Sequence, residues 1–99
     1  MMFVIIRPST KAGKKFEAVI DGKTTVAFGA KGYEDFTIHK DEDRKERYIK
    51  RHSTNEDWSD PLTAGMWSRF ILWNKPTILD SIEDVNRRFK NLKVKWSNV

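Results

Sequence analysis

Apolar and polar residues alternate along the chain with two different periods. Three short runs rich in β-branched and aromatic residues predict strands at 3–7, 16–20 and 24–28. Asp21 and Gly22 separate the last two runs, and an Asp-Gly pair in this position is a strong hairpin signal. Apolar residues alternate with lysines over 92–96, so the chain is predicted to close with a strand at the sheet edge.

Two stretches in the middle of the chain carry helix signals. Acidic residues at 41–43 and basic residues at 50–52 lie where the helix dipole favours each charge, which predicts a helix over 41–52. Three acid–base pairs at i, i+4 are expected to support it: Asp41–Lys45, Asp43–Arg47 and Glu46–Lys50. A second helix is predicted to begin at Asp60-Pro61 or at Thr63 and to end at Asn74.

Thr77 is predicted to cap a third helix, with Asp80 three positions later as in a capping box. Its apolar stripe has helical spacing: Ile78, Ile82, Val85 and Phe89. Residues 33–38 are predicted to form a short strand or an irregular crossing segment, and three phenylalanines are expected in the core: Phe16, Phe28 and Phe36. The predicted fold is α+β, a small antiparallel sheet (an N-terminal hairpin plus a C-terminal strand) packed with three short helices, and 1–99 form a single domain.

The amino-acid composition excludes several kinds of functional site. The chain contains no cysteine, which excludes disulfides, thiolate metal sites and cysteine nucleophiles. The apolar stretch before Arg7 is too short for a signal peptide or a membrane span, so we expect a protein that is not secreted and has no membrane partner.

Basic residues outnumber acidic ones, 19 Lys and Arg against 14 Asp and Glu, for a net charge of +5. From residue 87 onward every charged side chain is basic, a C-terminal basic strip made of Arg87, Arg88, Lys90, Lys93 and Lys95 beside Trp96. Such a strip suits a polyphosphate partner, and equally a solvated tail that aids solubility.

A second basic group lies on the helix predicted over 41–52. Its members recur at helical spacing and share one face, with Tyr48 beside them: Lys40, Arg44, Arg47 and Arg51. Arginines on one face can follow phosphates while a tyrosine stacks on a base. The alternative is a solvated helix face whose bases are neutralised by the intervening acids.

Catalytic signals are weak by comparison. His39, Asp41 and Asp43 offer an imidazole and two carboxylates for a divalent cation, as a metal-dependent nuclease requires, but acids at a helix N-terminus are already explained by capping. His39 and His52 would stand about 20 Å apart if one helix joined them, too far to act as an acid–base pair. No serine lies in a glycine-flanked elbow, so we expect no enzymatic activity and no cofactor.

Two sequence blocks resemble a family of uncharacterised short proteins encoded by large DNA viruses of algae and protists. The blocks are GYxDFTxHKDxxRKxRYxxRH, found at 32–52, and AGxWSRxxLWNKPT, found at 64–77. The resemblance implies a viral setting, with the protein in the virion or in the nucleus or cytoplasm of the infected host cell. It implies no assigned activity and no assigned site residue.

These observations lead to three hypotheses. The first is a non-enzymatic, virion-associated small basic protein that binds nucleic acid through phosphate contacts, using Arg44, Arg47, Tyr48, Arg51, Arg87, Arg88 and Lys93. The second is a minor capsid or cement protein whose partners are other virion proteins or further copies in an oligomer, with interface anchors at Trp58, Trp73 and Trp96. The third is the metal-dependent nuclease.

Overall fold

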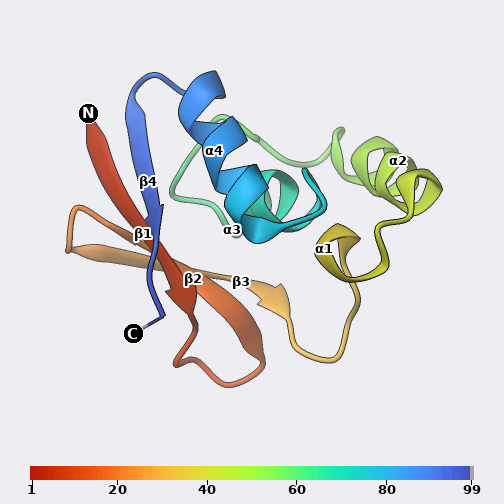
Figure 1. Ribbon diagram of the computed structural model, residues 1–99, viewed down its shortest axis with the longest axis horizontal. Helices are drawn as coiled ribbons and strands as arrows, with labels where there is room; N and C mark the ends of the chain where they lie inside the picture. Colours follow the sequence, from red (N-terminus) through yellow and green to blue (C-terminus); the bar gives the residue numbers. More distant parts are fainter. Residues whose placement is uncertain (99) are drawn as a thin grey trace.

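The computed structural model describes residues 1–98. Nine elements follow one another along the chain: β1 (Met2–Pro8), β2 (Lys14–Ile20), β3 (Thr24–Ala30), α1 (Phe36–His39), α2 (Glu42–His52), α3 (Ala64–Trp67), η1 (Ser68–Leu72), α4 (Ile78–Arg88) and β4 (Leu92–Trp96). The predicted α+β class is confirmed, with helices gathered on one side of a single sheet (Figure 1).

The four strands lie in the order β3-β2-β1-β4. The predicted hairpin is present, because β2 pairs antiparallel with β3 across a turn in which Asp21 and Gly22 both have positive φ angles of 52° and 67°. The C-terminal strand joins the sheet edge as predicted, but it pairs parallel to β1, with Val4 opposite Val94. The sheet is mostly antiparallel as predicted, and β4 alone departs from the prediction, because the helices between β3 and β4 form a long crossover that returns the chain in the direction of β1.

Alternation along the strands places one set of side chains under the helices. Val4, Ile6, Val94 and Phe28 are buried in this way, whereas Phe3 points to the opposite, uncovered face. The helices add Met66, Trp67, Ile71, Ile82 and Val85, among others, so the described residues share one hydrophobic core. Phe28 and Phe36 are buried as predicted, and Phe16 is half-buried against the same core.

The three predicted helices are present, with corrections at their ends. Thr63, rather than Asp60, caps α3, since its side chain accepts a hydrogen bond from the Met66 amide. The second helix continues as a π-helical turn, η1, and ends at Leu72. Phe89 lies just beyond the end of α4, where its amide still donates to the Val85 carbonyl.

The segment 33–38 was predicted incorrectly as a short strand or irregular crossing. Phe36–His39 instead forms the single helical turn α1, because the Asp35 side chain caps it by accepting from the Thr37 amide at 2.9 Å.

The expected acid–base pairs of α2 do not form. No ion pair within residues 1–98 joins Asp41 to Lys45, Asp43 to Arg47, or Glu46 to Lys50. The Lys45 ammonium instead donates to the Asn74 carbonyl at 2.7 Å, which joins α2 to the segment before α4. Among the described residues, no helix is long and apolar enough to cross a bilayer.

Candidate functional site: a basic and aromatic cleft

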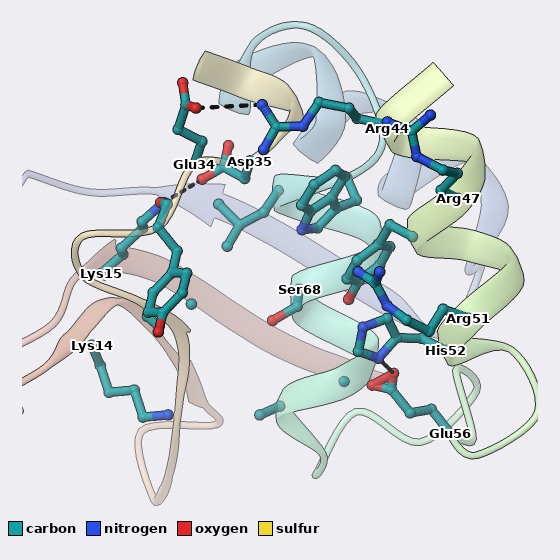
Figure 2. Close-up of a pocket in the computed structure, with 18 residues that line it drawn as sticks. Lys14, Lys15, Glu34, Asp35, Arg44, Arg47, Arg51, His52, Glu56 and Ser68 are labelled. Atoms are coloured by element: carbon teal, nitrogen blue, oxygen red, sulfur yellow. Dashed lines mark hydrogen bonds and ion pairs between the residues drawn. The ribbon is translucent and has the colours of Figure 1, made fainter. Parts of the chain in front are cut away.

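A cleft of about 700 Å³ lies between α2 and the ends of β2 and β3, with α3 and η1 behind it. Figure 2 shows Lys14 and Lys15 on one side, Arg47 and Arg51 on the other, and Ser68 between them. We call it the α2 cleft. A volume of this size is typical of pockets that hold a small organic ligand.

One face of α2 forms the basic wall of the cleft. Arg44, Arg47, Tyr48 and Arg51, which the sequence placed together, all line it. Lys40 does not join them, because it ends α1 with a left-handed backbone (φ 54°) and its ammonium donates to the Thr37 carbonyl.

Only part of this positive charge is neutralised within the protein. Arg44 pairs with Glu34 at 3.3 Å, and Lys15 pairs with Asp35 at 2.7 Å. Arg47, Arg51 and Lys14 have no ion-pair partner in the part of the chain that the structure describes. These three cations therefore face the cleft with their charge available to a ligand.

Four rings form a row behind the basic wall, which we call the ring row. Tyr48 stacks on Trp73 with ring centroids 4.4 Å apart and planes 3° from parallel. His39 packs on Trp73 at 5.3 Å, and His52 packs on Tyr48 at 4.3 Å. Burial raises the pKa of Tyr48, so the ring stays neutral at physiological pH. The row ends at His52, which is partly exposed in the cleft.

His52 lies beside an acid of the cleft. Its Nδ1 lies 3.1 Å from Oε2 of Glu56. Glu56 in turn lies against Gly65, where a methyl group on the glycine Cα would meet Oε1 of Glu56 at 2.6 Å. A side chain at position 65 would therefore displace the carboxylate that lies beside His52.

Lys15 fixes the opposite wall. Its ammonium donates to Oδ2 of Asp35 and to the Tyr33 carbonyl, which ties the segment after β3 to β2. The Tyr33 side chain projects from this segment and is 74% exposed. No ring contact connects Tyr33 to another aromatic residue within residues 1–98.

The other residues predicted to bind nucleic acid lie outside the α2 cleft. Arg87 pairs with Glu83 at 3.0 Å and Arg88 pairs with Asp84 at 2.7 Å, so both are engaged along α4. Lys93 lies on β4 and lines a separate hollow of about 480 Å³, together with Lys90 and Lys95. The predicted set therefore divides into two basic regions.

The three tryptophans predicted as interface anchors are each half-buried and packed against the core. Trp73 belongs to the ring row, and the Trp96 indole donates to the Asn98 side chain at 2.9 Å. The Arg69 guanidinium lies over the ring of Trp58, 5.5 Å from its centroid.

Two of the candidate metal ligands, His39 and Asp41, accept hydrogen bonds from backbone amides of their own segment. Oδ1 of Asp41 accepts from the amides of Asp43 and Arg44, and Nδ1 of His39 accepts from the Asp41 amide. Over the described range 1–98, no three His, Cys, Asp or Glu side chains gather in a way that could hold a metal ion.

Sequence reasoning missed part of the cleft. His52 could have been found, because it lies four residues after Tyr48 and so shares its helix face. Lys14, Lys15, Tyr33 and Glu56 carried no such signal, since their position depends on hairpin register and on how α2 packs against η1.

A model of DUF5754, a family of unknown function, matches residues 4–52. The similar part runs from β1 to the end of α2 and includes the whole basic face of that helix. Comparison with curated proteins and with solved structures gives no significant match.

Proposed function

We propose that this chain is a small, non-enzymatic protein that binds nucleic acid by its phosphates, and that the α2 cleft is the principal binding surface. The observation that carries the proposal is the pair of arginines Arg47 and Arg51, which line a cleft and have no acidic partner among the described residues. Unpaired arginine is well suited to phosphate because its planar fork can donate two parallel hydrogen bonds.

The arrangement of acids supports the same proposal. The carboxylates that line the cleft are each close to a basic side chain: Glu34 to Arg44, Asp35 to Lys15, and Glu56 to His52. A bound phosphate would therefore meet donors that are free, while the acids are held aside. The viral setting implied by the two sequence blocks makes a viral genome or its transcripts the expected ligand, and the virion or the infected cell the expected location.

The test is a salt titration of the full chain with fluorescently labelled nucleic acid, read by anisotropy. Binding should weaken linearly on a log–log plot, and each lost phosphate contact should make the slope shallower by about 0.7 for single strands or about 0.9 for duplex. Arg47→Gln and Arg51→Gln should each show that change. Lys23→Gln removes the same charge from the hairpin turn at the far end of β2 and should leave the slope close to the parent value.

Two results would contradict the proposal. Absence of binding at low salt would reject nucleic acid as the partner. An equal loss for Lys23→Gln and for the two arginine variants would mean that charge acts diffusely and that the α2 cleft is not the site. A parallel measurement on Lys93→Gln reports whether the C-terminal basic strip contributes.

A second candidate function is a minor capsid or cement protein. It is favoured by Phe3, which is 58% exposed on the face of the sheet that the helices leave uncovered. Aromatic residues are enriched at protein–protein contacts, so Phe3 is the candidate contact residue of this function. Phe3→Ser should abolish any self-association seen by analytical ultracentrifugation, and a concentration-independent monomer in the parent protein would argue against this function.

A further inference from the structure

We infer that the ligand of the α2 cleft is a single strand, whose unpaired bases stack on Tyr33 and on the exposed end of the ring row. The inference rests on the proposed function and specifies its ligand class. Phosphate contacts alone would serve duplex and single strand alike, so the aromatic residues of the cleft decide between them.

Tyr33 is the first of the two proposed stacking surfaces. The residue is 74% exposed and lines the cleft, and its ring contacts no other ring of the described chain. An aromatic ring in water gains nothing from its exposure, and Lys15 holds its backbone in place through the Tyr33 carbonyl. An unpartnered ring on an anchored backbone, beside a cationic wall, resembles the arrangement by which single-strand binding proteins hold bases.

The ring row supplies the second stacking surface. Trp73 and Tyr48 lie inside the row, and of its two ends His52 lines the cleft whereas His39 does not, so a base in the cleft would extend the row at His52. Oε2 of Glu56 lies 3.1 Å from Nδ1 of this ring, which places an acid beside the exposed end of the row. In Figure 2 the Arg51 side chain extends from α2 over this same part of the cleft, where it can contact the phosphate of a stacked nucleotide.

The size of the cleft agrees with this ligand. Its volume of about 700 Å³ admits an unpaired nucleotide. In a duplex each base is already stacked between its neighbours, so its faces are closed to Tyr33 and His52 and only the phosphates remain to be bound. Selectivity for unpaired strands is therefore expected to come from the rings, and salt dependence from the arginines.

The experiment compares three probes of equal length: a labelled single strand, the same strand paired with its complement, and an abasic strand that keeps only sugar and phosphate. The single strand should bind about 10-fold or more tightly than either of the others. Tyr33→Ala should weaken binding of the single strand by about 5- to 100-fold, as expected for one lost stack, and should leave the abasic strand unchanged. Tyr33→Phe keeps the ring and should bind as the parent does.

The outcomes distinguish single-strand selectivity from phosphate binding as such. Equal affinity for single strand, duplex and abasic strand would overturn the inference and leave phosphate binding intact. Binding of the single strand that is insensitive to Tyr33→Ala would also overturn it. If none of the three probes binds at low salt, the proposed function fails and the inference fails with it.

Discussion

The Asp84 carboxylate joins two separate parts of the chain. Its Oδ2 accepts hydrogen bonds from the Asn74 side chain at 2.8 Å and from Arg88 at 2.7 Å. Burial acts to raise the pKa of Asp84, but these hydrogen bonds outweigh it and lower the pKa to about 2. Asn74 also provides the carbonyl that receives Lys45, so this one acid supports the position of α2.

Acid should therefore weaken the fold through Asp84. The pKa of the folded state lies below the ordinary value near 3.8, so the stabilisation is complete above about pH 5 and is lost as pH falls through about 2. We expect a loss of about 2 kcal/mol in the free energy of unfolding over that range, measured by urea denaturation at several pH values. Asp84→Asn should be less stable near neutral pH and should flatten this dependence. Asp80→Asn, on the exposed surface of the same helix, should retain the parent's pH dependence.

Gly29 is required by both its backbone and its surroundings. Its φ is +77°, and a methyl group there would lie 2.7 Å from Cδ1 of Leu72. Gly32 has a similar φ of +87° but open space around it. Gly32→Ala should cost only the left-handed strain, about 1–2 kcal/mol, whereas Gly29→Ala should cost about 1–3 kcal/mol more. Equal melting temperatures for the two variants would show that Leu72 can move aside at no cost.

For single residues, the sequence correctly predicted which side chains share a helix face, because this depends only on neighbours a few positions away in the chain. Arg44, Arg47, Tyr48 and Arg51 share a face because of helical spacing alone, and the structure places them in one cleft. The ion pairs along the same helix were predicted by the same spacing and do not form. Lys45 is drawn to a carbonyl from a distant segment instead, a tertiary contact that spacing cannot reveal.

Among the elements, α2 carries most of the basic wall of the cleft, and Asp41 caps its first turn. Asp41 accepts from the amides of Asp43 and Arg44 at 3.0 and 3.3 Å. Asp41→Ala should destabilise the protein by about 1 kcal/mol, because these amides lose their partner. Asp41→Asn keeps an accepting oxygen and should stay within a few tenths of a kcal/mol of the parent in thermal unfolding followed by circular dichroism. A loss as large as that of alanine would show that charge, rather than capping, is what the position supplies.

Cap residues also explain which elements could be predicted. Asp41, Thr63 and Thr77 each precede a helix and each accepts from its first turn, so three helices were visible in the sequence. The turn α1 was missed because its four residues, Phe36–His39, are too few to show a period. The π-helical turn η1 was missed because its residues fit an ordinary helical pattern equally well.

At the scale of the whole molecule, the first and last strands of the chain lie side by side in the sheet. The chain begins in β1 and ends in β4, and these strands pair in parallel beside each other (Figure 1). Asn86 of α4 fixes the free side of β4, since its side chain donates to the Val94 carbonyl at 3.0 Å and accepts from the Val94 amide at 2.8 Å. Alternation in the sequence predicted β4, but its direction depends on where the intervening helices leave the chain, which no local pattern records.

Because β4 completes the shared core, the described chain should unfold as one cooperative unit. Val94 is 3% exposed, and Val94→Ala should lower the free energy of unfolding by about 2–3 kcal/mol. The neighbouring Lys93→Ala, on the exposed face of the strand, should change it by less than about 0.5 kcal/mol. Far-UV circular dichroism reports the whole backbone, whereas tryptophan fluorescence measured in a Trp96→Phe background reports Trp58, Trp67 and Trp73, which all lie outside β4. The two probes should shift together in Val94→Ala, since loss of the edge strand exposes the core on which the α2 cleft is built. A fluorescence transition that stayed at the parent midpoint while the dichroism moved would show that α2 and its cleft keep their structure independently of the sheet.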